Sequence, residues 1–242
     1  TTGDNNIAVG YNALTANTTG GGNTALGSSA LKANTGSNNT AVGFNALLQN
    51  TSGGENTAIG DGALYTNTTG EKNNAMGRLS LRYNTSGDNN MAAGHYALYA
   101  NTTGSNNTAL GYQAGNVITN GNSNVILGSN ADPSGATASN QIVIGKSAVG
   151  HGDNIAVIGN TDMTALHPAD DNGVDLGSSS YAFKDLYVDG TANIANFNMG
   201  VNSTITSSTT FNGTATIIPV NTENGAVTIT IDSDQKVAGR IL

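Results

Sequence analysis

Apolar positions recur along the first half of the chain at a nearly constant interval. Each copy of the pattern places an alanine and then a second apolar residue directly before a glycine. These glycines are Gly10, Gly27, Gly43, Gly60, Gly77, Gly94 and Gly111, and all but one of the intervals between them are identical. A period that regular is typical of a solenoid, in which each copy is one structural unit stacked on the next.

The rest of each unit is polar and rich in turn-forming residues. An alanine and a leucine follow three and four positions after most of these glycines, as in Ala63 and Leu64. A run of the type Asn-Thr-(Thr/Ser)-Gly comes next, as at 67–70. This run and the internal glycine are incompatible with a long helix. We therefore predict an all-β fold, with two short strands per unit joined by Asn/Gly turns into a parallel β-roll or β-solenoid.

The small residues of the pattern predict close stacking and a thin core. Coils stack ~4.8 Å apart in the hydrogen-bonding direction, and unvarying alanine and glycine positions are expected where backbones approach each other. One coil of this size buries few aliphatic side chains, and it depends on its neighbours for stability. We therefore expect several chains to associate along the stack, side by side or intertwined.

The pattern changes after about residue 115. The later glycines follow longer aliphatic runs, and the last interval, from Gly145 to Gly159, is shorter than those before it. Near the end of the chain the repeat is absent, but β-branched residues alternate with period two, which predicts a small β module. The predicted segments are the 17-residue-repeat roll (1–115), a region of 14- to 17-residue repeats (116–167), a connector (168–190) and the C-terminal β module (191–242).

Two of the later segments resemble a known family. Residues 141–150 (Gln-Ile-Val-Ile-Gly-Lys-Ser-Ala-Val-Gly) and 154–159 (Asn-Ile-Ala-Val-Ile-Gly) closely resemble the head repeats of YadA-type trimeric autotransporter adhesins. The heads of that family are left-handed parallel β-rolls assembled as trimers. The resemblance covers roughly residues 1–160 and implies a homotrimer. The 17-residue units depart from the family pattern by their longer turns.

A second resemblance lies in the connector. Residues 175–190 read Asp-Leu-Gly-Ser-Ser-Ser-Tyr-Ala-Phe-Lys-Asp-Leu-Tyr-Val-Asp-Gly and look like a segment that is common in bacteriophage tail fibres and tailspikes. In many of those proteins the segment precedes an endosialidase-type intramolecular chaperone. The resemblance implies that such a chaperone was removed from this chain or lies beyond it. It favours a phage fibre over a bacterial adhesin.

Catalysis finds little support in the sequence. The histidines His95, His151 and His167 have no neighbour at a recognised metal-ligand spacing, and no nucleophile-elbow, Walker or dinucleotide-binding motif occurs. His95 occupies a variable position after its glycine, so we expect an outward side chain. The acidic run at 170–175 lacks the pattern of an EF-hand loop and is interpreted as a solvated turn. The chain also has no cysteine, and we expect no enzyme activity, cofactor or metal.

Asparagine recurs once per unit in the polar part of the repeat. We interpret these residues as turn formers whose side chains bond to the backbone or to one another from coil to coil. Several also form glycosylation sequons, and a regular Thr/Asn face is an alternative match to an ice lattice, although the threonines lie in a turn context. The copies are Asn17, Asn34, Asn50, Asn67, Asn84 and Asn101.

Aromatic residues gather in the middle units. Tyr65 and Tyr99 occupy the same repeat position two coils apart, with Arg82 at that position between them. Stacking places the three in a row about 10 Å long, from twice the ~4.8 Å spacing. Amphipathic rings and arginine are favoured in recognition, so Tyr65, Arg82 and Tyr99 are our candidate receptor contact. Scattered surface variation is the alternative explanation.

These features together predict a structural and adhesive fibre protein. We expect a homotrimeric, extracellular phage tail fibre that attaches to a glycan or protein receptor on the host surface, with avidity from three copies. The first alternative is the passenger of a bacterial trimeric adhesin on the cell surface. The second is a glycan-degrading tailspike, although the carboxylates that it needs are sparse in the repeats. The formal net charge of −8 opposes nucleic-acid binding, and no apolar run is long enough for membrane insertion.

Overall fold

The chain separates into two compact units, Thr1–Ala169 and Asp170–Leu242. Within the second unit, the Ser178 amide donates to the Tyr181 carbonyl oxygen at 2.9 Å and closes a turn. The predicted C-terminal module and most of the connector lie outside the described residues. The computed structural model describes residues 3–167, 176, 178, 180–185, 187 and 188.

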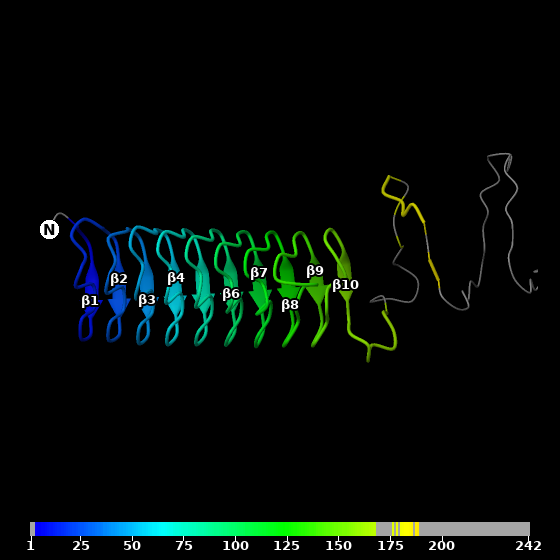
Figure 1. The fold of residues 1–242 in the computed structure, drawn as a ribbon, viewed down its shortest axis with the longest axis horizontal. Helices are drawn as coiled ribbons and strands as arrows, with labels where there is room; N and C mark the ends of the chain where they lie inside the picture. Colours follow the sequence, from blue (N-terminus) through cyan, green and yellow to red (C-terminus); the bar gives the residue numbers. More distant parts are fainter. Residues whose placement is uncertain (1–2, 168–175, 177, 179, 186, 189–242) are drawn as a thin grey trace, which may run out of the picture. The chain divides into compact units, whose positions relative to one another are not determined.

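Residues 3–167 form a parallel β-solenoid, which confirms the predicted fold class at that level. Ten three-residue strands make one sheet and pair in sequence order (Figure 1). No helix occurs among the residues that the structure describes. The strands are β1 (Ile7–Val9), β2 (Thr24–Leu26), β3 (Thr40–Val42), β4 (Thr57–Ile59), β5 (Asn74–Met76), β6 (Met91–Ala93), β7 (Thr108–Leu110), β8 (Val125–Leu127), β9 (Ile142–Ile144) and β10 (Ala156–Ile158).

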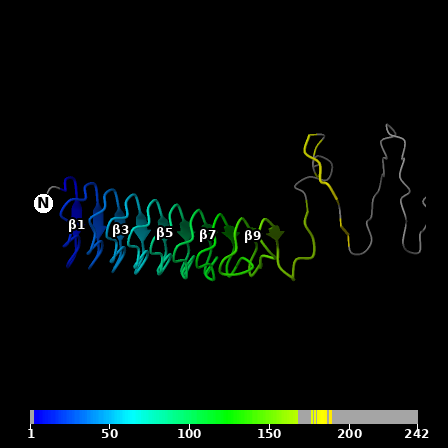
Figure 2. The same cartoon turned by 45° about the horizontal axis from the view of Figure 1, so that its top comes forward.

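Each strand pairs with the next at the interval that the repeat predicts. Ala58 of β4 aligns with Ala41 of β3 and with Ala75 of β5. The last pair aligns Val143 with Val157, which matches the shorter interval from Gly145 to Gly159. The shorter unit therefore still forms one complete coil. Figures 1 and 2 show the coils as a single row, and each strand contacts only the strands before and after it.

The prediction of two strands per unit is wrong, because each coil contains only one. After the strand and its glycine, the chain passes through a left-handed conformation at a buried leucine, such as Leu64 with a φ of 49°. The amides of Leu64 and Thr66 still donate to carbonyl oxygens of the next coil, both at 3.0 Å. These turn segments are therefore hydrogen-bonded from coil to coil, but each is too bent to form a strand. The same left-handed φ recurs at Leu14, Leu31, Leu47, Leu81 and Leu98.

In the coils of β2, β3, β4 and β6, the interior has an apolar half made of two alanines and one leucine. In β4 the middle residue, Ala58, is fully buried, whereas Ile59 beside it is exposed. This alternation follows from the period of two in a strand. Ala63 and Leu64 of the following turn are also fully buried and complete this half. A single leucine per coil makes a thin core, as the small residues of the repeat predict.

The other half of the interior is polar and consists of two asparagine ladders. In the predicted ladder, from Asn50 to Asn101, each side-chain amide donates to the side-chain oxygen of the asparagine one coil earlier, at 2.6 to 2.8 Å. In the second ladder, which precedes the strands, Asn56 Oδ1 accepts the backbone amide of Asn73 at 2.9 Å. Both ladders meet at one carbonyl, because Gly70 O accepts the Nδ2 groups of Asn56 at 2.8 Å and Asn67 at 2.9 Å. The interpretation of the asparagines as a stacked ladder is therefore confirmed, and a second ladder accompanies it.

The glycine after each strand is required by the stacking. Gly60 has a φ of 138°, and a Cβ at this position would lie 2.6 Å from the carbonyl oxygen of Gly77 in the next coil. A side chain is therefore excluded both by the backbone conformation and by the neighbouring coil. The predicted close approach of backbones is confirmed along this column.

The interior changes character at one point, which we call the 115–118 exchange. Gly115 occupies the position of the buried leucines, and Ile118 occupies that of the first-ladder asparagines. Ile118 is fully buried, and its Cδ1 lies 3.4 Å from where a Cβ on Gly115 would be, so it fills the leucine space. The exchange ends the ladder, and Asn101 Oδ1 has no hydrogen-bond partner. The sheet itself continues through β8, β9 and β10.

Candidate ligand-binding surface

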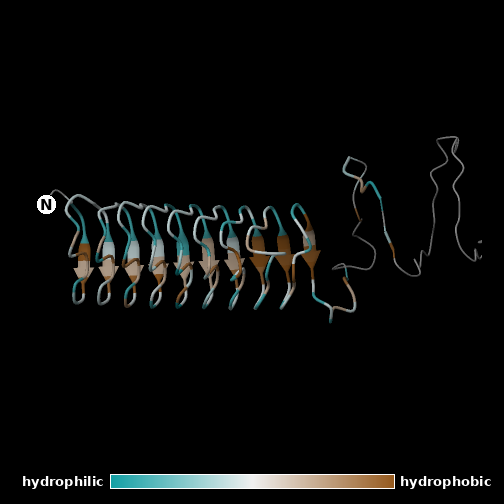
Figure 3. Cartoon of the chain, in the orientation of Figure 1, coloured by the Kyte–Doolittle hydropathy of each residue, from teal (hydrophilic) through white to brown (hydrophobic). Residues whose placement is uncertain are grey.

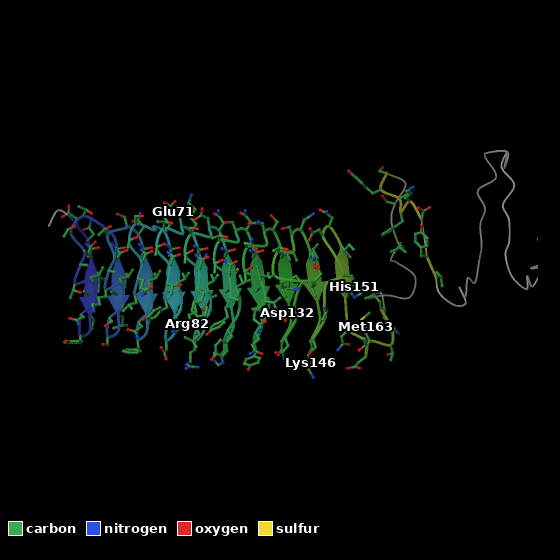
Figure 4. The ribbon with its side chains drawn as sticks, viewed as in Figure 1. Glu71, Arg82, Asp132, Lys146, His151 and Met163 are labelled. Carbon is green, nitrogen blue, oxygen red and sulfur yellow. The ribbon has the colours of Figure 1, made fainter. Side chains whose placement is uncertain are left out.

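Tyrosine, histidine and arginine side chains gather on the turns that follow strands β4 to β7. Figure 4 labels Arg82 on these turns and Glu71 on the opposite turns, which precede the strands. Five of the chain's eight tyrosines lie in this group. The group, called the turn cluster below, consists of Tyr65, Arg78, Arg82, Tyr83, His95, Tyr96, Tyr99 and Tyr112.

Stacking places the three predicted contact residues in adjacent coils. The Tyr83 amide donates to the Tyr99 carbonyl oxygen at 3.3 Å, which holds the turns of Arg82 and Tyr99 in register. The Arg82 guanidinium carbon lies 4.7 Å from the ring centroid of Tyr65 and 5.6 Å from that of Tyr83, within cation–π range. Arg82 therefore contacts Tyr65 directly, whereas Tyr83 links Arg82 to Tyr99.

Tyr83 and Tyr96 connect the members of the cluster. They do not share the repeat position of Tyr65, Arg82 and Tyr99, so the period of the sequence does not identify them. The Tyr83 and Tyr99 rings meet edge to face with centroids 4.9 Å apart, and the Tyr99 hydroxyl donates to the Tyr83 oxygen at 3.4 Å. Tyr96 packs against Tyr99 in the same way, also at 4.9 Å. The hydrogen bond from Tyr99 and the adjacent Arg82 guanidinium hold the pKa of Tyr83 below its usual value, and the same hydrogen bond raises the pKa of Tyr99.

His95 belongs to the cluster and is not an isolated surface side chain. Its ring stacks on Tyr96 with centroids 4.1 Å apart and meets the edge of Tyr112 at 5.7 Å. Its Nε2 lies 3.2 Å from Arg78 Nη1, and Arg78 Nε lies 3.5 Å from Asp61 Oδ2. Asp61, Arg78, His95 and Tyr112 share the variable position after successive glycines. That shared position is the sequence signal that identifies these contacts.

The two edges of the solenoid carry opposite charge. The turns that follow the strands hold most of the basic side chains, and the turns that precede the strands hold most of the acidic ones. The first edge has four cations and two exposed acids, net +2, or +1 if the half-buried Asp132 is ionised; the second has five acids and one cation, net −4. The first edge carries Lys32, Asp61, Arg78, Arg82, Lys146 and Asp162, and the second carries Asp4, Glu55, Glu71, Lys72, Asp88 and Asp153.

The outer face of the sheet carries a second continuous surface, an apolar stripe. It is formed by the third residue of each strand, and the exposed fractions of Leu26, Ile59 and Leu110 are 48%, 43% and 55%. The stripe spans ten strands, about 43 Å at nine intervals of ~4.8 Å. In Figure 3 the strands β8 to β10 are brown, whereas the arrows in the middle of the sheet are paler and include teal parts. A contiguous exposed apolar surface of this length is unusual for a monomeric soluble protein. Its residues are Val9, Leu26, Val42, Ile59, Met76, Ala93, Leu110, Leu127, Ile144 and Ile158.

The polar groups of the ladders are engaged inside the solenoid. Asn67 and Asn84, which lie in glycosylation sequons, are fully buried, so their side chains are enclosed in the core. The Thr68 hydroxyl donates to the carbonyl oxygen of Thr85 at 2.9 Å, and the Thr85 hydroxyl donates to that of Thr102 at 3.0 Å. This threonine column therefore bonds to the next coil instead of forming a free array that could match an ice lattice.

Asp132 is a half-buried carboxyl group in the coil after β8. Burial raises its pKa to about 6, opposed by backbone hydrogen bonds from Val117 and Asn116. Its Oδ1 has no hydrogen-bond partner. His151 and His167 are exposed. Among the described residues, no three His, Cys, Asp or Glu side chains are grouped closely enough to hold a metal ion.

No helix among the described residues has the length and apolarity needed to cross a membrane. Comparison with protein-family models, curated proteins and solved structures finds no match for this chain.

Proposed function

We propose that the chain is a structural and adhesive segment of a homotrimeric extracellular fibre, in the particular role of a phage tail fibre. The observation that carries this proposal is the apolar stripe, which runs the full length of the ten-stranded sheet. A partner that covers a periodic surface along its whole length needs the same repeat. A further copy of this chain, stacked in register, provides it.

Association also compensates for the thin core. Each coil buries little beyond two alanines and one leucine. Covering a half-exposed side chain such as Ile59 or Leu110 removes further apolar area from water, on the order of 1 kcal/mol for each. Summed over the stripe, this contribution is comparable to the net stability of a small domain. The number three comes from the resemblance to trimeric adhesin heads.

The adhesive part of the proposal rests on the turn cluster. Tyrosine and arginine are enriched at recognition surfaces, because they combine apolar area with polar groups. Three copies on one fibre convert the second and third contacts into intramolecular events and raise avidity. The connector sequence supports a phage tail fibre, and the bacterial adhesin passenger remains the alternative role.

The mass of the native particle, measured by light scattering with and without mild denaturant, tests the assembly. We expect a species near three times 24.2 kDa that loses its β signal only when it dissociates. Replacing Ile59 and Leu110 with glutamate places charges in the stripe and should prevent assembly. The matched control is Thr69→Glu, on an exposed turn outside the stripe. A folded monomer of the native chain, or an Ile59→Glu/Leu110→Glu variant that keeps the native mass, contradicts the proposal.

A further inference from the structure

We infer that the turn cluster binds an acidic glycan, a saccharide chain whose sugar rings carry carboxylates. This inference deepens the attachment role proposed above and rests on it for its biological setting. Binding itself requires only the turns after β4 to β7, all of which are described.

The rings of the cluster suit a sugar. A sugar ring has an apolar C–H face and a rim of hydroxyl groups, so its partner must offer apolar area and hydrogen-bonding groups side by side. Tyrosine combines a ring face with a hydroxyl in this way. The exposed fractions of Tyr83 and Tyr112 are 42% and 47%. With Tyr96 and Tyr99, they give the turn cluster four tyrosine hydroxyl groups.

Arg82 supplies the group that recognises a carboxylate. Arg78 is already paired with Asp61, whereas within residues 3–167 Arg82 has no carboxylate within 4.0 Å. Its guanidinium is positioned by the ring of Tyr65, at 4.7 Å, and a cation–π contact of this kind does not consume N–H donors. Arginine presents these donors as a planar fork that fits a carboxylate through two parallel hydrogen bonds.

The charge of the surroundings favours an anion at this edge alone. The edge that carries the cluster has a net positive charge, while the opposite edge is negative and the whole chain is −8. An anionic polymer is therefore attracted to this edge of the described solenoid and repelled by the opposite edge. Lys146 contributes to the positive charge of the same edge. It lies several coils along the stack from Arg82 and outside the turn cluster, as Figure 4 shows.

The cluster is already ordered before a ligand arrives. Ring contacts link Tyr83 with Tyr99, Tyr99 with Tyr96, and Tyr96 with His95, at centroid distances of 4.9, 4.9 and 4.1 Å. Side chains that are held by their neighbours lose less conformational entropy on binding. The cluster as a whole spans the turns after four successive strands, from Tyr65 after β4 to Tyr112 after β7, so a linear chain of sugars can contact several coils at once.

Isothermal titration calorimetry of the full chain with oligogalacturonate, which carries a carboxylate on every sugar, tests the inference. A neutral maltooligosaccharide of matched length is the reference ligand. We expect the acidic oligosaccharide to bind at least tenfold more tightly, and its affinity to fall with added salt. Arg82→Gln and Arg82→Lys should each weaken binding tenfold or more, since even lysine lacks the fork. Lys146→Gln, which removes one charge from the same edge, should change affinity less than twofold.

The native mass of every variant is measured alongside, which separates this inference from the fibre proposal. Tighter binding of the acidic ligand by a folded monomer sustains the inference and overturns the trimer. A trimer that binds neither oligosaccharide, or both equally, overturns the inference and leaves the trimer standing. An Arg82→Gln trimer with native affinity also overturns it, as does an equal loss of affinity in the Lys146→Gln control.

Discussion

Ile118 shows how one side chain decides where a polar ladder ends. At the equivalent position of the six preceding units the residue is asparagine, and from Asn50 onward each Nδ2 group donates to the Oδ1 of the asparagine one coil earlier. An isoleucine cannot donate, so Asn101 Oδ1 is buried without a partner. Gly115, which stands where the other coils have leucine, leaves room for the isoleucine. Ile118 fills the space that a leucine at position 115 would take.

The two halves of the 115–118 exchange should therefore be strongly coupled. Ile118→Asn alone leaves a cavity beside Gly115, and Gly115→Leu alone overfills it, so each should lower the free energy of unfolding by about 2 to 4 kcal/mol. The double variant restores the pattern of the earlier coils and gives Asn101 a donor. We expect it to be at least as stable as the more stable single variant, with a coupling energy above ~1 kcal/mol in urea unfolding. Additive effects of the two substitutions would contradict this account.

Asp132 should make stability depend on pH. Burial raises its pKa in the folded chain to about 6 from an ordinary value of 3.8, so the folded state binds more protons between these values. Its contribution is therefore fully present below pH 3.8 and is lost as pH rises through 6. Asp132→Asn should raise the Tm above pH 6 and leave it nearly unchanged at pH 4, as followed by circular dichroism.

The control for this prediction is Asp162→Asn, which removes the same charge from an exposed position. Its melting temperature should differ from that of the native chain by a similar small amount at both pH values. If Asp162→Asn reproduces the pH-dependent gain of Asp132→Asn, the effect comes from net charge, and the half-buried carboxyl is not its cause.

At the scale of the repeating element, the asparagine ladder behaves as a chain of shared bonds. Asn67 donates to Asn50 Oδ1 at 2.7 Å and to Gly70 O at 2.9 Å, and it accepts a bond from Asn84 at 2.7 Å. Asn67→Ala removes all three and leaves Asn50 Oδ1 buried without a donor. We expect a loss of about 3 kcal/mol in urea unfolding at a fixed protein concentration.

Asn17 provides the matched comparison for the ladder. It is half-buried and bonds only to Gly20 of its own turn. Asn17→Ala should therefore cost about 1 kcal/mol. Equal costs at the two positions would mean that the ladder adds nothing beyond an ordinary turn.

The repeat unit also shows where sequence patterns stop being informative. The intervals between the repeat glycines predict the register of β1 to β7, and the structure has that register. The repeat pattern predicts a second strand in each unit, but Leu64 and its equivalents adopt a left-handed φ. Leucine has no local preference for that conformation, so stacking imposes it, and stacking is not visible in a single unit.

At the scale of the whole molecule, aligning the residues that share a repeat position finds part of the candidate site. It aligned Tyr65, Arg82 and Tyr99 because they share a repeat position. It missed Tyr83 and Tyr96, which reach the same cluster from neighbouring columns through the direction of their side chains. The period specifies which backbones stack, whereas contacts between columns depend on rotamers that the period does not encode.

The near-constant coil has a consequence for how such chains diversify. Each strand contacts only its neighbours in the sheet. If one complete coil is gained or lost, the coils on either side can still stack through the same kind of contacts. Recombination between almost identical gene segments would produce such changes in a single event. The length of the rod is then adjustable in steps of ~4.8 Å, and the distance at which it holds its binding surface can change without redesign of the fold.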